Sequence, residues 1–198
     1  MSRALTIYLV DLATARAAVA SHNDKLRRMI GGRFKEDFAR ADHWFSGEIA
    51  QGAPTRHDAL KAVIEGGPFL DRQGFQYGYA YEMIVRHFGK YLNNNAFSPF
   101  RGDWLEQVDR GLAALKLSVR VTAFYGTPPS PIPPPDEVPG YGEWSHEQCA
   151  QGLVEWDATT TEQRQAVDPE VLSAITDCVE WMRATRAKPG LGVAGFFF

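Results

Sequence analysis

The sequence predicts a mostly helical α+β fold, in which one domain spans residues 1–198 and contains a small β-sheet and a long proline-rich surface loop. Several stretches place apolar residues three and four positions apart, as amphipathic helices do, whereas only three short stretches have the composition of strands. Seven of the 12 prolines fall between Pro128 and Pro139, where they exclude a regular helix or strand. We therefore expect helix to exceed strand by more than two to one.

Strands are expected in three places. Residues 4–10 (ALTIYLV) combine Leu, Ile, Tyr and Val without a charge, which is typical of a buried strand. Residues 117–125 alternate in hydrophobicity, which is typical of a strand with one buried face. Residues 192–198 (GVAGFFF) are apolar enough to form a final strand.

The first half of the chain predicts five helices, over residues 12–20, 21–30, 34–49, 55–65 and 77–92. Ser21 and Thr55 each precede an aspartate by three residues, which is the spacing of a helix-capping pair, and glycines at 31–32 and 66–67 are expected to end two helices. The clearest helix is the one over 34–49, with an apolar stripe formed by Phe34, Phe38, Ala41, Phe45 and Ile49. The helix over 77–92 has an apolar face formed by Tyr77, Tyr81, Ile84, Val85 and Phe88.

The second half predicts three more helices. Asp103 is placed to cap a helix with the apolar face Leu105, Val108, Leu112 and Leu115. Ser145 and Gln148 have capping-box spacing before a helix that reaches Trp156. Asp168, followed by Pro169, begins a long helix that buries Val171, Ile175, Cys178 and Met182.

The proline-rich segment, residues 127–140, is expected to run over the surface in an extended conformation. Its prolines lack backbone donors, so the segment is expected to add little to the core. Shortening it should then cost little stability and should weaken the capture of a partner.

Composition excludes several classes of function. The formal net charge is −3, whereas a protein that binds nucleic acid through many phosphates carries a basic excess. The apolar runs are too short for a membrane span, and the first residues lack the layout of a signal peptide. We therefore expect a cytoplasmic protein that binds neither nucleic acid nor membrane.

Short catalytic and metal-binding motifs are missing from the sequence. Gly190, Gly192 and Gly195 match GxGxxG in letters, but no helix follows them to hold a phosphate. None of the five histidines has another histidine three or four residues away, so neither a metal nor a cofactor is expected. His146 and Cys149 lie one helical turn apart, which in a reactive pair lowers the thiol pKa; we favour a buried, structural Cys149.

The most suggestive polar group of residues lies in the middle of the chain: Tyr79, Arg86, His87, Arg101, Asp103 and Trp104. If these residues converge, their phenol, guanidinium and indole groups form a cleft for an anionic or planar ligand. The alternative is a local salt bridge and helix cap made by Arg101 and Asp103, with the aromatic rings in the core. Tyr141 and Trp144 are expected either to close the cleft as a lid or to anchor the proline-rich segment.

Three phrases of the chain, GFQYGYAYEMIVRHFG, FRGDWLEQVDRGLAAL and PGYGEWSHEQ, resemble a family of bacterial proteins, mostly from actinomycetes, labelled DUF7691. The resemblance runs almost end to end and includes IYLVDL and CVEWMR. It implies no activity, cofactor or catalytic residue. The size of the chain and its late helix also resemble the YfbM-like proteins.

Two functions remain in consideration. The first is a non-catalytic protein that binds another protein, as immunity and regulatory proteins do, and it accounts for the proline-rich segment and the lack of catalytic motifs. The second is a small-molecule-binding protein or enzyme that uses the cleft around Tyr79, Arg86, Arg101, Asp103 and Trp104. A deep pocket with shifted pKa values favours the second, and a shallow apolar patch favours the first.

Overall fold

A computed structural model describes residues 3–198, and within them the fold is α+β and mostly helical, as predicted. Ten α-helices and four strands lie in these residues, and helix exceeds strand by more than two to one. The chain forms two compact units. Unit 1 contains residues 3–12, Gly89–Gly126 and Tyr141–Phe198, and unit 2 contains Ala13–Phe88 and Thr127–Gly140. That all 198 residues form one domain stays a prediction.

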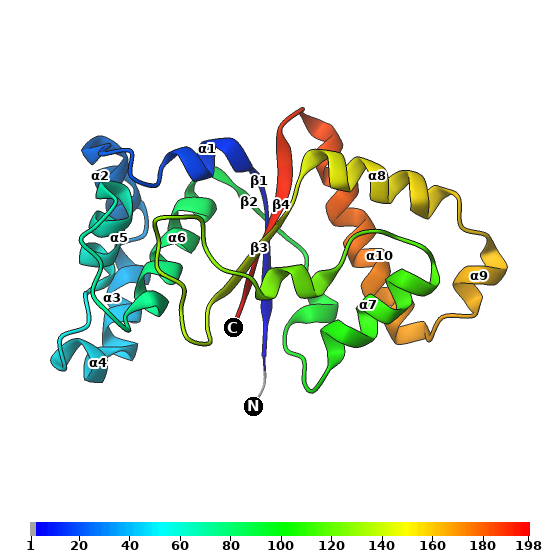
Figure 1. Cartoon of the computed structure of the whole chain (residues 1–198), viewed down its shortest axis with the longest axis horizontal. Helices are drawn as coiled ribbons and strands as arrows, with labels where there is room; N and C mark the ends of the chain where they lie inside the picture. Colours follow the sequence, from blue (N-terminus) through cyan, green and yellow to red (C-terminus); the bar gives the residue numbers. More distant parts are fainter. Residues whose placement is uncertain (1–2) are drawn as a thin grey trace. The chain divides into compact units, whose positions relative to one another are not determined.

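The strands of unit 1 form one sheet in the order β2-β1-β4-β3 (Figure 1). They are β1 (Leu5–Asp11), β2 (Lys90–Leu92), β3 (Gly140–Trp144) and β4 (Leu191–Phe197). β1 is antiparallel to both β2 and β4, and Tyr8 is opposite Tyr91 on one side and Ala194 on the other. The strands predicted at residues 4–10 and 192–198 are thus confirmed.

The helices of unit 1 pack around one hydrophobic core. They are α7 (Trp104–Ala114), α8 (His146–Asp157), α9 (Thr161–Gln165) and α10 (Pro169–Ala184), with 3-10 turns η1 (Asn95–Phe97), η2 (Val121–Tyr125) and η3 (Thr185–Ala187). α10 contacts α7 and α8, and its predicted apolar face is buried. The predicted capping box of Ser145 with Gln148 and the N-cap at Asp168 are both present, so the starts of α8 and α10 are confirmed.

The strand predicted over residues 117–125 is wrong. Leu117, Val119 and Val121 are buried in alternation as predicted, but residues 121–125 form η2 and belong to no strand. The Asp109 carboxylate explains the difference, because it accepts hydrogen bonds from the Val121 N–H (2.6 Å) and the Thr122 N–H (3.4 Å). A side chain takes the place of a neighbouring strand as the acceptor for this backbone.

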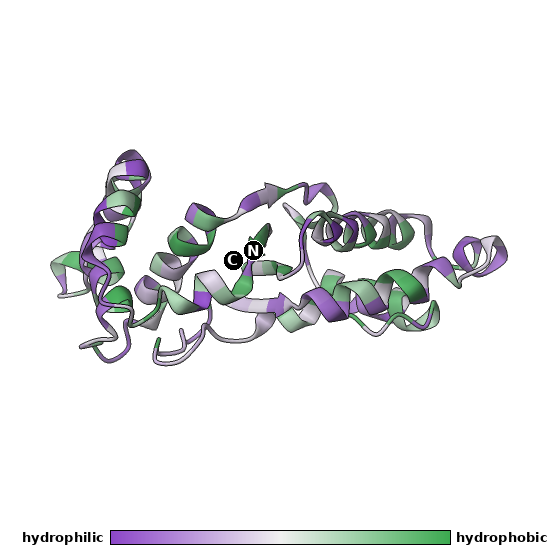
Figure 2. Cartoon of the chain, turned by 90° about the horizontal axis from the view of Figure 1, so that it is seen from above, coloured by the Kyte–Doolittle hydropathy of each residue, from purple (hydrophilic) through white to green (hydrophobic). Residues whose placement is uncertain are grey.

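Unit 2 contains helices that follow one another in the chain and form one compact group (Figure 1). They are α1 (Leu12–Ala17), α2 (Asp24–Arg33), α3 (Lys35–Trp44), α4 (Ser46–Ala50), α5 (Arg56–Glu65) and α6 (Gly74–Phe88). α5 contacts α2, α3 and α6. The helices carry both hydrophobic and hydrophilic residues, as expected of helices with one buried face (Figure 2).

The predicted start and end of α2 are wrong. The Ser21 hydroxyl donates to the Ala18 carbonyl, and Asn23 caps the helix instead by accepting from the Leu26 N–H. The helix also continues through Gly31 and Gly32. Gly31 is buried against α5, where a Cβ atom would lie 3.0 Å from the His57 ring, so this glycine permits close packing of two helices.

The helices predicted over 34–49 and 77–92 are each interrupted. The first divides at Phe45 into α3 and α4, and only Phe34 and Phe38 of its apolar stripe are buried. The second ends at Phe88, because residues 90–92 pair with β1 as strand β2. A three-residue strand carries no periodicity that could distinguish it from a helix end.

The proline-rich segment packs more closely than predicted. Residues 127–139 form neither helix nor strand, yet Ile132 is only 4% exposed, and Pro128 and Pro139 are buried. Two glycines of α6 face the segment: a Cβ at Gly74 would lie 2.3 Å from a backbone oxygen of Pro134, and one at Gly78 would lie 2.8 Å from the Pro139 ring. The expectation that the segment adds little to the core is therefore wrong, because it covers one face of α6 within unit 2.

Within residues 3–198, no helix combines the length and the apolar composition that a membrane-spanning helix requires.

Candidate functional site

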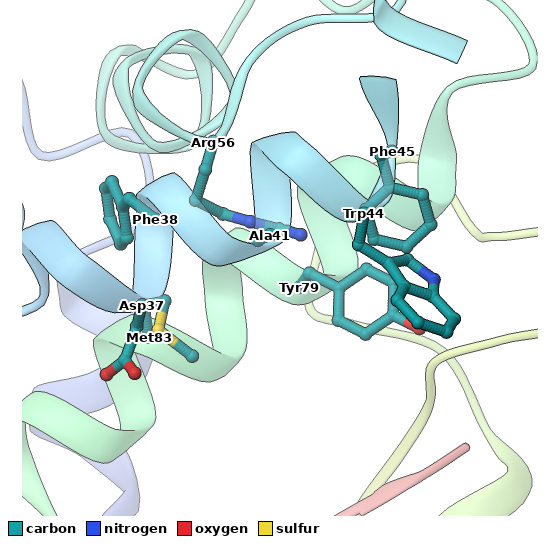
Figure 3. A pocket seen from close by; sticks show the side chains of 8 residues that line it. All are labelled: Asp37, Phe38, Ala41, Trp44, Phe45, Arg56, Tyr79 and Met83. Atoms are coloured by element: carbon teal, nitrogen blue, oxygen red, sulfur yellow. The ribbon is translucent and has the colours of Figure 1, made fainter. Parts of the chain in front are cut away.

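The candidate site is a pocket of unit 2 between α3, α5 and α6, with a volume of about 250 Å³ (Figure 3). Its walls are formed by Asp37, Phe38, Ala41, Trp44, Phe45, Arg56, Tyr79 and Met83. Most of these side chains are apolar or aromatic, and one is a buried cation. This combination is typical of a binding pocket, in which a few polar groups orient the bound group.

Arg56 is the first residue of α5, and the N-terminus of that helix fixes its position. The Thr55 side chain caps the helix by accepting from the Asp58 N–H, as predicted. The Arg56 backbone N–H donates to the Asp42 carboxylate at 2.7 Å, and the guanidinium donates to the Gln76 carbonyl at 3.1 Å. Arg56 is only 3% exposed, so α5 holds its charge inside the unit.

Aromatic rings surround the Arg56 guanidinium. Its central carbon lies 4.8 Å from the centre of the Tyr79 ring and 5.9 Å from that of Phe45. The Phe45 ring itself lies 5.5 Å from Tyr79 and 5.4 Å from Phe75. Cation–π attraction therefore compensates part of the cost of burying the charge.

Arg56 and Tyr79 each keep one charge state near neutral pH. Burial lowers the pKa of Arg56 to about 10, although Tyr79, Glu82 and Asp42 act in the opposite direction. Burial raises the pKa of the Tyr79 phenol, which Arg56 partly opposes. At pH 7 the pocket thus presents a positive guanidinium and a neutral phenol, a pair suited to holding an anionic group rather than to exchanging protons.

One wall of the pocket is exposed to solvent. Trp44, the last residue of α3, is 82% exposed, although tryptophan is among the largest hydrophobic side chains. Asp37 lies at another part of the wall, where it forms an ion pair with Arg86 at 3.0 Å and a second one with Arg40. Two arginines thus accompany the negative charge of Asp37.

Three predicted site residues belong to this unit. Tyr79 lines the pocket, and Arg86 adjoins it through Asp37 while its guanidinium lies 4.8 Å from the Phe34 ring. His87 does not line the pocket; its carbonyl accepts from Arg33 at 2.9 Å, and burial, with Arg33, lowers the pKa of its imidazole. Of the three, only Tyr79 lines the pocket, and Arg86 contacts a residue of its wall.

The predicted residues Arg101, Asp103 and Trp104 lie in unit 1 and act locally there. Arg101 is exposed, and the Asp103 carboxylate accepts from Gln107 at 2.7 Å and from Arg110 at 3.2 Å. These contacts differ from the predicted salt bridge of Asp103 with Arg101. Asp103 does precede α7 as predicted, but its side chain makes no capping hydrogen bond. The Trp104 indole N–H donates to the carbonyl of Ala96 at 2.8 Å.

Tyr141 and Trp144 are anchors of strand β3 in unit 1. Trp144 is 1% exposed, donates from its indole N–H to the Arg120 carbonyl at 3.0 Å, and has its ring 5.0 Å from that of Phe124. Tyr141 is also buried, with its ring 4.9 Å from Phe196 and its hydroxyl bonded to Glu143. Both side chains thus belong to the interior of unit 1, and neither lines the pocket; their roles as a lid or as anchors of the proline-rich segment stay predictions.

Sequence reasoning missed most of the pocket. Arg56 stood beside a predicted helix cap, but nothing in the sequence indicates that the first side chain of α5 turns inward. Trp44 lies off the apolar stripe of residues 34–49, so helical periodicity does not point to it. A large aromatic residue on the polar side of an amphipathic helix is the signal that could have identified it.

The pair of His146 and Cys149 does not form a reactive site. The His146 ring contacts the Leu191 carbonyl at 3.2 Å, whereas the Cys149 thiol points to the Trp144 carbonyl at 3.9 Å. Cys149 is fully buried, and burial raises its pKa to about 12. This agrees with the structural role favoured for it. Among the residues that the structure describes, no group of three or more His, Cys, Asp or Glu side chains could hold a metal ion.

Comparison with known proteins identifies the family but no activity. A family model described as a domain of unknown function, DUF7691, matches residues 1–198. Neither a curated protein nor a solved structure shows significant similarity to the chain. The likeness to the YfbM-like proteins and the bacterial origin stay predictions. The match over the whole length shows that this chain, with its pocket around Arg56, belongs to the DUF7691 family.

Proposed function

We propose that the protein is a non-catalytic, cytoplasmic binding protein of the immunity-like or regulatory kind, which recognises another protein through the pocket of unit 2. The observation that carries this proposal is the Trp44 side chain, 82% exposed in the pocket wall. An indole this exposed lacks the stabilisation that burying its apolar surface would give, and contact with a partner surface would supply that burial.

The residue types in the pocket support a protein partner. Tryptophan, tyrosine and arginine contribute most often to binding energy at protein interfaces, and Trp44, Tyr79 and Arg56 lie together here. A volume of about 250 Å³ accommodates one inserted side chain. The pocket therefore suits an anchor residue of a partner, surrounded by a wider contact that includes the exposed face of α3.

A small-molecule-binding protein or enzyme is the second candidate. Tyr79 lines the pocket and Arg86 adjoins it, as the predicted polar cleft requires. Acid–base catalysis at neutral pH needs a group with a pKa near 7, however. Burial lowers the pKa of Arg56 only to about 10 and raises that of Tyr79, so both groups stay protonated at pH 7. The pocket and its shifted pKa values therefore favour a small-molecule site, as a site for binding rather than for catalysis, and the exposed Trp44 is the observation that favours a protein partner over it.

The test compares two exposed positions of unit 2. A partner is first captured from a lysate of the source organism and purified, and its affinity is then measured by calorimetry with Trp44→Ala and with Leu70→Ala. Leu70 is 49% exposed and does not line the pocket, so it serves as the matched control. We expect Trp44→Ala to weaken binding at least about tenfold and Leu70→Ala less than about twofold. Equal affinities of the two variants would show that the partner binds elsewhere.

A further inference from the structure

We propose that the group received by this pocket is a carboxylate beside an apolar or aromatic side chain, carried by an acidic segment of the partner protein. This inference rests on the proposed function and specifies the partner group. The buried Arg56 guanidinium, the apolar pocket walls and the ion pairs of the nearby Asp37 support it.

The Arg56 guanidinium is positioned for an acceptor from outside the unit. It lines the pocket, and the Gln76 carbonyl accepts from one of its two terminal nitrogens. A guanidinium carries five N–H donors in a planar fork, which matches the two oxygens of a carboxylate. Since the group is held by α5 and stacked over the Tyr79 ring, little freedom is lost when a ligand binds.

Burial disfavours the charge of Arg56 more strongly than the neighbouring groups favour it. Three groups favour the charged form, namely Tyr79, Glu82 and Asp42, yet the pKa of Arg56 is still lowered because burial outweighs them. Asp37, the acidic residue of the pocket wall, is engaged by Arg86 and Arg40. A carboxylate that accepts from the Arg56 guanidinium would offset part of the cost of burying that charge.

The rest of the pocket wall is mostly apolar, so a ligand that fills the pocket needs an apolar group next to its anion. Phe38, Ala41, Phe45 and Met83 supply apolar surface, and the exposed Trp44 indole lies at the same site (Figure 3). A free inorganic anion would leave this surface uncovered. An acidic residue followed by an aromatic one satisfies both parts of the pocket, because its carboxylate reaches Arg56 while its ring packs on Trp44.

The experiment changes the probe rather than the buried arginine, because an Arg56 variant can fail to fold. Blocked dipeptides acetyl-Glu-Phe-amide and acetyl-Gln-Phe-amide are titrated into the whole protein, with benzoate as a small-molecule comparison. Binding is followed by NMR on the indole N–H signal of Trp44, which a Trp44→Phe variant assigns. We expect the glutamate peptide to bind at least about tenfold more tightly than the glutamine peptide, and added salt to reduce the difference.

The possible outcomes separate the inference from the proposed function. Equal binding of the two dipeptides would overturn the carboxylate inference and leave the protein-binding proposal standing. Binding of benzoate with neither peptide would overturn the inference of a carboxylate carried by a partner protein, in favour of a small aromatic acid, while the partner measurement with Trp44→Ala would still decide the proposed function. A Trp44 signal that responds to none of the three probes at millimolar concentration would overturn the carboxylate inference, while the partner measurement with Trp44→Ala would still decide the proposed function.

Discussion

The Phe38 side chain serves both the interior of unit 2 and the wall of its pocket. It is 1% exposed, and its ring lies 4.7 Å from that of His57 in an edge-on contact. The amphipathic stripe of residues 34–49 correctly identified Phe38 as core. The stripe could not show that the same ring borders a pocket, because that depends on Arg56 and Tyr79, which other helices supply.

Replacing Phe38 by alanine should destabilise the protein by about 3 to 5 kcal/mol, as expected for a buried phenylalanine. Phe88→Ala is the control, because Phe88 is 37% exposed at the end of α6, and its loss should cost less than about 1 kcal/mol. Both free energies of unfolding are measured by urea denaturation. A loss below about 1 kcal/mol for Phe38→Ala would contradict its place in the core.

At the scale of elements, the sequence predicted helices better than it predicted what lies between them. The capping residues Thr55, Ser145 and Asp168 gave correct helix starts, because a cap is a local interaction within three residues. The prediction of a strand over 117–125 was wrong because the Asp109 side chain accepts the hydrogen bond of the Val121 backbone. Alternating hydrophobicity shows which side chains are buried, but it does not show which group accepts the backbone hydrogen bonds.

Asp109 should accordingly stabilise η2 in a measurable way. Asp109→Ala leaves the N–H groups of Val121 and Thr122 without their acceptor, at an expected cost of about 2 to 4 kcal/mol. Asp103→Ala is the matched control near the start of the same helix, where the carboxylate is exposed, and its effect should stay within about 0.5 kcal/mol. Similar unfolding free energies for the two variants would refute the role assigned to Asp109.

The two glycines of α6 show how a segment without regular structure can belong to a core. Gly74→Ala should destabilise unit 2 by about 1 to 3 kcal/mol, because its Cβ would overlap the backbone of Pro134. Gly32→Ala is the control, since it is also helical and nothing lies within 4 Å of its added Cβ; it should be neutral or stabilising by up to about 1 kcal/mol. Thermal unfolding of both variants tests the expectation, and a neutral Gly74→Ala would restore the original prediction of a loosely attached loop. Because the proline-rich segment packs on α6, a variant in which residues 127–140 are shortened should have a lower unfolding temperature than the wild type.

At the scale of the whole molecule, the fold class was predictable and the site was not. Mostly helical α+β structure follows from local periodicity and composition, which the sequence displays directly. The pocket depends on α3, α5 and α6, and the decisive side chains, Trp44 and Arg56, lie at helix ends where periodicity gives no direction. The predicted cleft also drew residues from both units, whereas the pocket lies in one.

Stability of the whole molecule should fall in alkaline solution because two thiols are buried. Burial raises the pKa of Cys149 from 9.0 to about 12 and that of Cys178 well above 9.0. Folded thiols therefore retain protons that unfolded ones lose, so the stability is full below about pH 9 and decreases from there as the pH rises toward 12. At pH 10 the loss should be on the order of 1 kcal/mol for each thiol relative to pH 8.

Urea denaturation at pH 8 and pH 10 measures this effect, and a Cys149→Ala, Cys178→Ala double variant is its control. The double variant should show a smaller decrease between the two pH values, whatever its stability at pH 8. The assignment to the thiols is wrong if the wild type and the double variant lose the same free energy.

Strand β4 lies between β1 and β3 in the sheet, although it follows both of them in the chain. During translation β1 leaves the ribosome early, yet neither β1 nor β3 acquires this neighbour until residues 191–197 have been made. A nascent chain interrupted before Leu191 therefore exposes the unpaired N–H and C=O groups of two strands, which can pair with strands of other chains. Messages cut short before this point should accordingly yield insoluble or rapidly degraded protein, even when they encode every residue of the Arg56 pocket.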